Sequence, residues 1–103
     1  MRVEILHIDE CPNWEQAGQR ASDALDALGI RETAVEYRLL RTSDEAAAVW
    51  FAGSPTILVD GADAFPSDGR TSDLACRLYY TDAGISRLPT VEQLTRVFQE
   101  HLI

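Results

Sequence analysis

The chain contains no lysine and only two cysteines, and each shortage excludes a class of protein. All nine basic residues are arginine, scattered from Arg2 to Arg96, and they face 17 acidic residues, for a formal net charge of −8. Because such a field repels phosphate backbones, we expect no nucleic acid partner. The two cysteines, Cys11 and Cys76, exclude a cysteine-rich scaffold and a closely spaced metal motif.

Long apolar runs are also missing, which predicts a protein without a transmembrane helix and without a membrane partner. The first apolar stretch is interrupted by Glu4 and His7 and lacks the pattern of a signal peptide, so we expect a cytoplasmic protein. In a reducing compartment both cysteines should rest as thiols. Each is then a packed residue, a reactive group or a ligand for a soft metal ion.

The composition is that of an ordinary globular protein, with 46% hydrophobic and 25% charged residues. A length of 103 residues allows one modest core, so we expect a single domain over residues 1–103. We expect a monomer or a weak homodimer.

The pattern of apolar residues predicts strands at residues 3–8, 35–40, 56–59 and 62–65, with Asp60-Gly61 as the hairpin turn between the last two. Residues 12–28 carry the apolar stripe of a helix, with Pro12 in its first position and Gly29 as its stop. Residues 66–73 have the composition of a loop, and residues 74–80 favour a strand over a helix.

Two capping boxes predict the remaining helices. Thr42 and Glu45 open a short helix before the apolar residues 46–51, with Gly53 just beyond its end. Thr90 and Gln93 open a second helix. Its apolar stripe comprises Val91, Leu94, Phe98 and Leu102.

This order of strand, helix, strand, helix, two strands, insert and helix resembles the thioredoxin superfamily. Two short motifs carry the resemblance, Cys11-Pro12-Asn13-Trp14 at the start of the first helix and Ser54-Pro55-Thr56 before the third strand. The resemblance implies a thioredoxin-like α/β fold with a central mixed β-sheet flanked by helices. It also implies a reactive-position cysteine at Cys11 and a cis Pro55. The implied substrate groove places Trp14, Ser54, Pro55 and Thr56 at the substrate-binding positions.

The chain departs from the redox members of that superfamily at one position. Their C-x-x-C pair places a second cysteine at the fourth position, where this chain has Trp14. A local resolving thiol is therefore absent. A second resemblance is to the organomercurial lyases, which share a thioredoxin-like core and use cysteines with an aspartate; the stretch Cys76-Arg-Leu-Tyr-Tyr is similar to their segment.

The reactivity of Cys11 depends on two opposing effects. At the expected N-cap of the first helix, unpaired N–H groups and the helix dipole lower the pKa of the thiol and favour a thiolate. Asp9 and Glu10 place two carboxylates next to it, which disfavours a second anion. The sequence thus leaves open a reactive Cys11 and an inert small residue.

Cys76 likewise has two interpretations. It alternates with Leu74, Leu78 and Tyr80, which indicates a buried apolar residue on one face of a strand. Alternatively, the hairpin returns the chain to the level of Pro55, so the following loop can bring Cys76 over Cys11. Trp14 and Trp50 lie on apolar helix faces and are expected in the core. His7 and His101 lack metal-ligand spacing and receive no role.

Three functional hypotheses follow from the sequence. In the first, the protein exchanges thiols and disulfides with a protein or a small-molecule thiol or disulfide. Cys11 is then the nucleophile and Cys76 the distal resolving thiol. In the second, the two cysteines bind a soft metal ion or a mercurial. In the third, the chain is a non-catalytic interaction module. No organic cofactor is implied.

Overall fold

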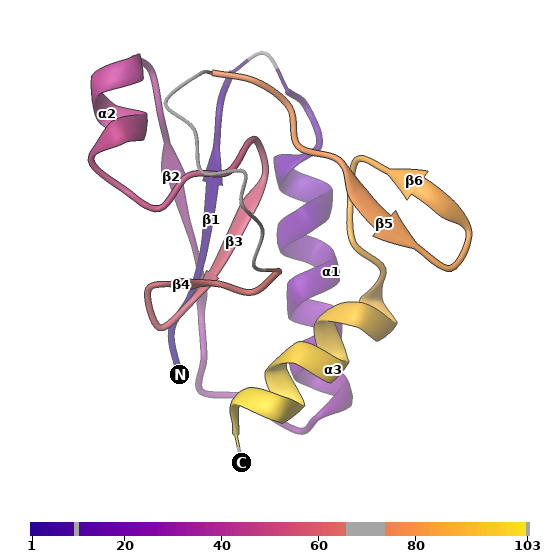
Figure 1. The fold of residues 1–103 in the computed structure, drawn as a ribbon. Coiled ribbons are helices and arrows are strands. Elements are labelled where there is room, and N and C mark those ends of the chain that lie inside the picture. Colours follow the sequence, from indigo (N-terminus) through magenta and orange to yellow (C-terminus); the bar gives the residue numbers. More distant parts are fainter. Residues whose placement is uncertain (10, 66–73, 103) are drawn as a thin grey trace.

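The computed structural model describes residues 1–9, 11–65 and 74–102 (Figure 1). It is a small α/β fold with a mixed four-stranded sheet, three helices and a separate two-stranded hairpin. In chain order the elements are β1 (Val3–His7), α1 (Trp14–Ala27), β2 (Val35–Leu39), α2 (Ser43–Ala47), β3 (Thr56–Val59), β4 (Ala62–Asp63), β5 (Tyr79–Thr81), β6 (Gly84–Ser86) and α3 (Val91–His101).

The main sheet has the strand order β2-β1-β3-β4. β1 runs parallel to β2 and antiparallel to β3, and β3 pairs antiparallel with β4. The predicted hairpin turn is confirmed, because Asp60 and Gly61 adopt φ angles of 50° and 87°, as a type I′ turn requires. β1 therefore occupies an inner position of the sheet, and the chain that leaves it emerges beside the start of β3.

The two faces of the sheet carry separate apolar clusters because successive strand residues point to opposite sides. Val3 and Ile5 of β1 face α1 and α3, where they join the cluster that contains Leu94 and Phe98. Leu6 faces the other side and joins a smaller cluster around α2. That smaller cluster also contains Ile8, Cys11, Leu40, Ala46, Phe51 and Leu58.

The first helix begins later than the sequence predicts. Asn13 is its N-cap and Trp14 its first residue, so the expected positions of Cys11 at the N-cap and of Pro12 in the first helical position are wrong. The N–H of Cys11 instead points back to the carbonyl of Ile8, which keeps Cys11 in the turn that leaves β1. The predicted stop is confirmed, since Gly29 has a φ of 73°.

The capping box of α3 forms as predicted, whereas the box predicted for α2 forms only in part and α2 is shorter than expected. Thr42 Oγ1 accepts from the N–H of Glu45, but the Glu45 carboxylate accepts from the N–H of Arg41 rather than from Thr42. α3 has the full reciprocal box between Thr90 and Gln93.

Two apolar residues expected in the core are exposed. Leu102 lies at the end of α3 and is 56% exposed, and Trp50 follows α2 in a turn and is 43% exposed. The helical stripe fails for Leu102 because α3 ends at His101 and Leu102 is its C-cap. Trp50 lies outward because the helix ends at Ala47, so that Phe51 is the residue directed into the core.

The segment that begins at residue 74 differs most from the prediction. Residues 74–80 do not form one strand: Cys76 makes an isolated bridge, and the regular strand β5 begins only at Tyr79. β5 then pairs with β6 in a hairpin that projects beside α1 and α3 (Figure 1), which the sequence did not predict. The predicted loop at residues 66–73 lies outside the described residues.

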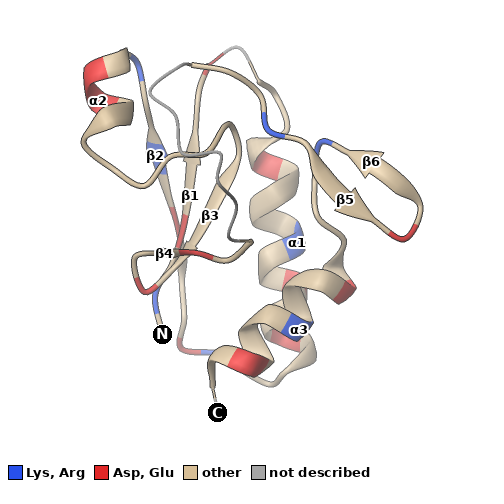
Figure 2. Cartoon of the chain, in the orientation of Figure 1, with Lys and Arg blue, Asp and Glu red and all other residues tan. Residues whose placement is uncertain are grey.

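Charged residues occur in many elements of the fold rather than in a single one. In Figure 2 acidic residues are visible on all three helices and in the turns, with arginines between them. Among the described residues, no helix is both long and apolar enough to cross a membrane.

Candidate functional site

The two cysteines, 65 positions apart in sequence, are joined by a disulfide. Their Cα atoms are 6.2 Å apart, within the usual range for such a bond. Of the two alternatives that the sequence left for Cys76, the one that brings it close to Cys11 is therefore confirmed, while the loop proposed to carry the chain there lies outside the described residues. The sequence predicted two free thiols, as expected in a reducing compartment, but the structure has both sulfurs in one disulfide.

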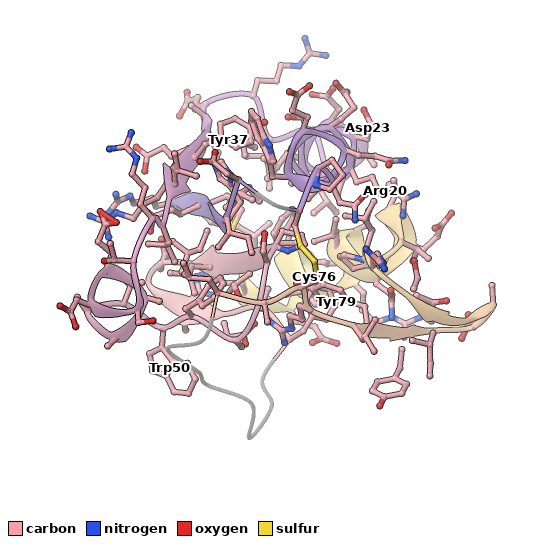
Figure 3. The ribbon with its side chains drawn as sticks, turned by 90° about the horizontal axis from the view of Figure 1, so that it is seen from above. Arg20, Asp23, Tyr37, Trp50, Cys76 and Tyr79 are labelled. Atoms are coloured by element: carbon pink, nitrogen blue, oxygen red, sulfur yellow. A yellow bond between two sulfur atoms is a disulfide. The ribbon has the colours of Figure 1, made fainter. Side chains whose placement is uncertain are left out.

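The two halves of the disulfide differ in exposure. Cys11 is completely buried in the apolar cluster on the α2 side of the sheet. Cys76 is exposed, so its interpretation as a buried strand residue is wrong. Figure 3 shows the disulfide from above, with the labelled Cys76 beside Tyr79. Cys76 is therefore the solvent-exposed half of the pair.

The backbone of Ser54 holds in place the residues around Cys76, here called the Cys76 segment (residues 75–79). The N–H of Ser54 donates to the carbonyl of Ala75, and the N–H of Arg77 donates to the carbonyl of Ser54, both at 2.8 Å. These two bonds form the isolated parallel bridge between Ser54 and Cys76. Ser54 Oγ in turn accepts from the N–H of Ile8 at 3.1 Å. One residue thus connects the chain before Cys11 with the chain around Cys76.

The Ser54–Pro55 peptide bond is cis, as predicted. The side chains of Ser54, Pro55 and Thr56 are fully buried, and Thr56 Oγ1 donates to the carbonyl of Gly53 and accepts from the N–H of Ala52. The backbone N–H and carbonyl of Ser54 are both used by the chain itself. These three residues form a buried support beneath the segment that carries Cys76.

Gly53 permits the close approach of the Cys76 segment. It has a φ of 108°, and a Cβ built on it would lie 2.8 Å from Cβ of Arg77 and 3.0 Å from its Cα. Any larger residue at this position would both strain the backbone and push Arg77 away. The sequence predicted Gly53 just beyond the end of a helix, and no local signal indicated its contact with Arg77.

Arg77 is the second feature that the sequence analysis missed. It is 7% exposed, and its Nη1 lies 3.0 Å from both carboxylate oxygens of Asp63 in β4. Its Nη2 donates to the carbonyl of Phe65, and its guanidinium lies 4.7 Å from the ring centroid of Tyr79. The alternation of residues 74–80 was detectable in the sequence, but the apolar residues were assigned to the wrong face because a buried arginine is rare.

Tyr79 completes the anchoring of the segment. Its ring is buried against Phe65, and its hydroxyl donates to the carbonyl of Pro55. Burial raises the pKa of Tyr79 well above its ordinary value, so the hydroxyl keeps the proton that it donates. Arg77 and Tyr79 thus fasten the residues on both sides of Leu78 to the main sheet.

Trp14, a predicted substrate-binding residue, is half-buried on the face of the sheet that packs against α1. Its ring stacks on His7 with centroids 4.5 Å apart and meets Tyr37 edge-on at 5.4 Å. His7 is 6% exposed, and its Nδ1 has no hydrogen-bond partner among the described residues. Burial lowers the pKa of His7, which keeps the ring neutral. Trp14 is held by these two rings, and no contact joins it to Cys76 in the described residues.

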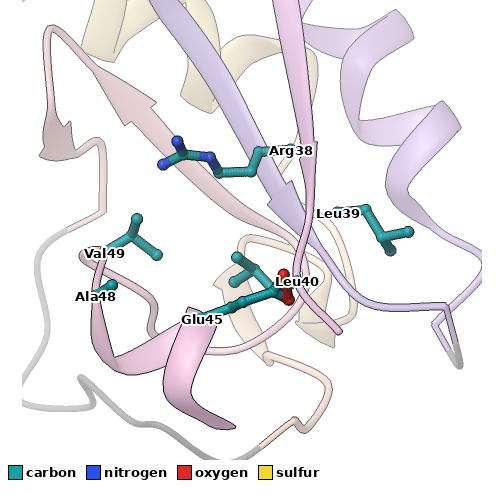
Figure 4. Close-up of a pocket in the computed structure, with 6 residues that line it drawn as sticks. All are labelled: Arg38, Leu39, Leu40, Glu45, Ala48 and Val49. Carbon is teal, nitrogen blue, oxygen red and sulfur yellow. The ribbon is translucent and has the colours of Figure 1, made fainter. Parts of the chain in front are cut away.

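Two hollows lie on the α2 side of the sheet. One of about 300 Å³ separates the end of β2 from α2 (Figure 4) and is lined by Arg38, Leu39, Leu40, Glu45, Ala48 and Val49. The other has a volume of about 240 Å³ and includes residues two or three positions from a cysteine. It is lined by Ile8, Asp9, Leu40, Arg41 and Leu74. Both combine an apolar floor around Leu40 with an arginine at the rim.

The described residues contain no group of three or more His, Cys, Asp or Glu side chains placed to hold a metal ion. The distinctive chemical group of the site is therefore the half-buried disulfide on its hydrogen-bonded support. Comparison with protein families, curated proteins and solved structures gave no match to this chain.

Proposed function

We propose that this chain is a thioredoxin-like protein that exchanges thiols and disulfides through the pair Cys11 and Cys76. The observation that carries the proposal is the Cys11–Cys76 disulfide itself, with one cysteine buried and the other exposed. Exposed disulfides are open to attack and are the labile or catalytic ones, whereas structural disulfides are protected.

The arrangement of the sheet supports the thioredoxin-like part of the proposal. An inner strand, β1, runs parallel to β2 and antiparallel to β3, and the first cysteine follows β1 directly. The cis bond before Pro55 lies at the start of β3, where Ser54 bridges to Cys76. Fold alone does not specify an activity, so the chemistry of the disulfide remains the principal argument.

The backbone bridge makes the exchange feasible without large movement. Because Ser54 bonds to the residues on both sides of Cys76, the segment stays attached when the disulfide is reduced. The two thiols then remain close enough to close again. In the reduction, two external thiols lose two electrons and two protons and form a disulfide, while Cys11 and Cys76 gain them and become thiols.

The reduction potential tests this proposal directly. The oxidised protein is equilibrated in defined glutathione redox buffers, quenched by alkylation and analysed by mass spectrometry. We expect a midpoint between about −120 and −270 mV, the range of exchange proteins. A midpoint below about −300 mV, together with no transfer of oxidising equivalents to a reduced protein substrate, would identify a structural disulfide. The interaction module would then be the better description.

A variant with both cysteines replaced by serine is the control for the same experiment, because its mass should not change with the buffer. The reduced wild type also tests the soft-metal hypothesis, since two thiolates held near each other favour soft cations. Tight binding of Hg²⁺ to the reduced protein, lost in the control, together with no exchange activity would favour that hypothesis over the redox role.

A further inference from the structure

Every second residue in the segment 76–80 is exposed. Their exposure alternates: Cys76 is exposed, Arg77 is 7% exposed, Leu78 56%, Tyr79 3% and Tyr80 78%. This period of two is that of extended chain, so Leu78 and Tyr80 point outward on the same side, next to the exposed Cys76, whose side chain is bonded to Cys11. Arg77 and Tyr79 point inward to their partners in the main sheet.

The hairpin extends this face with one more apolar residue. Tyr80 pairs with Ile85 across the β5–β6 ladder, which places their side chains next to each other on the same side. Ile85 is 64% exposed. We call Leu78, Tyr80 and Ile85 the outer ridge. It supplies three of the six large hydrophobic residues that are exposed in the described chain, and it begins two residues from the exposed cysteine.

The outer ridge is held in a fixed position. The hydroxyl of Tyr79 is bonded to Pro55, and the side-chain amide of Gln93 in α3 donates to the carbonyl of Tyr80 at 2.8 Å. An exposed apolar strip on a well-anchored hairpin is typical of an interaction surface. The strip carries no charge, although the chain as a whole has a net charge of −8.

We propose that exchange enters through Cys76 rather than Cys11, and that the partner is a folded protein dithiol that covers the outer ridge while its thiolate attacks Cys76. This inference rests on the proposed function. It reverses the roles expected from the sequence, because the buried sulfur of Cys11 is shielded from an incoming thiolate. A small thiol needs only the sulfur, whereas a protein also contacts the apolar side chains beside it.

The reaction proceeds in two balanced steps. The partner thiolate attacks Sγ of Cys76, a partner–Cys76 disulfide forms, the Cys76–Cys11 bond breaks, and Cys11 leaves with the electron pair and takes up a proton. The second thiolate of the partner then attacks the partner's own sulfur in the mixed disulfide. Cys76 leaves as a thiolate, and the partner departs with a disulfide.

Single-cysteine variants test the point of entry. Cys11→Ser leaves only Cys76, and Cys76→Ser leaves only Cys11. Each variant is mixed with a protein whose single cysteine is activated as a mixed disulfide with thionitrobenzoate, and release of the dye is followed. We expect Cys11→Ser to react about tenfold faster or more, because access governs the rate. Equal rates, or faster reaction of Cys76→Ser, would overturn the entry through Cys76.

The ridge is tested in the protein that retains both cysteines. Leu78→Ser and Leu102→Ser are matched variants, since both leucines are 56% exposed but only Leu78 belongs to the ridge. Reduction by thioredoxin should slow about threefold to tenfold in Leu78→Ser and stay unchanged in Leu102→Ser, as for the loss of an interface contact. The rate of reduction by dithiothreitol should be the same in both variants.

Other outcomes separate the two proposals. If Leu78→Ser slows dithiothreitol as much as thioredoxin, or if the wild type is a dimer that Leu78→Ser dissociates, the ridge is not a site for a protein reductant and the inference fails while exchange stands. If the wild-type disulfide resists both reductants, the proposed function fails and the inference fails with it.

Discussion

The core beneath α1 and α3 and the segment around Cys76 are held together by different forces. In the core, residues from β1, β3 and the two helices bury apolar side chains that follow the periods of strand and helix. The Cys76 segment is held by a buried ion pair, backbone bonds to Ser54 and one disulfide. Hydrophobic burial depends little on exact geometry, whereas the polar contacts depend on it strongly. We therefore expect the two regions to respond differently to mutation.

Truncation in the core should have the largest effect. Phe98 is completely buried between α3 and the sheet, so Phe98→Ala should lower the free energy of unfolding by about 3–5 kcal/mol. Leu102→Ala, at the exposed C-cap of the same helix, should lower it by less than about 1 kcal/mol. Urea denaturation of the oxidised proteins measures both, and similar losses would show that α3 packs by a different face.

Removal of the buried arginine should be the most damaging change in the segment. Arg77→Leu leaves the Asp63 carboxylate buried without its partner, which costs about 3 kcal/mol. The double variant Arg77→Leu, Asp63→Leu removes both charges and should recover part of that loss. Stability measured by urea denaturation checks both, and a double variant less stable than Arg77→Leu would contradict the buried pair.

Gly53→Ala should disturb the segment by a steric contact. The added methyl group meets Arg77, so we expect a loss of about 1–3 kcal/mol in the free energy of unfolding and slower closure of the disulfide after reduction. Gly84 is the matched control, because its φ is 107° but nothing lies within 4 Å of its Cβ position. Equal effects of the two alanines would assign the whole cost to backbone strain.

The smallest expected effect is on the pH dependence of the unfolding free energy, and it comes from the buried His7. Burial lowers the pKa of His7 below 6.5, so the unfolded chain binds a proton at a higher pH than the folded one. Stability contributed by neutral His7 is therefore present above pH 6.5 and declines as the pH falls below that value. His7→Phe should flatten the profile of unfolding free energy between about pH 7 and 5. An unchanged slope would show that His7 titrates normally.

A second titration lies outside that window. The exposed Asp60 accepts from His101 at 2.5 Å, and this hydrogen bond lowers the pKa of the Asp60 carboxyl. Its contribution to stability is present above the ordinary aspartate pKa and is lost at more acidic pH. Protonation of the Asp60 carboxyl therefore lies below the pH range in which His7 is tested.

The sequence by itself determined the elements whose signals are local. Period and turn chemistry suffice for β1, β2 and β3, the Asp60-Gly61 hairpin and the capping box at Thr90, because each depends on residues a few positions apart. The start of α1 was misplaced because the turn through Cys11 depends on where its neighbours in space hold it. For the same local reasons the pattern in residues 74–80 was visible, but not which of its two faces points inward.

Only the tertiary structure decided the site. Whether Cys76 is buried or exposed depends on Asp63, Ser54 and Pro55, which hold Arg77 and Tyr79 from positions 14 to 24 residues away. These contacts make an arginine and a tyrosine the inward residues and leave the apolar ones outside. A single sequence records the alternation but not the partners that select the face, since a buried charge is stable only beside its counter-ion.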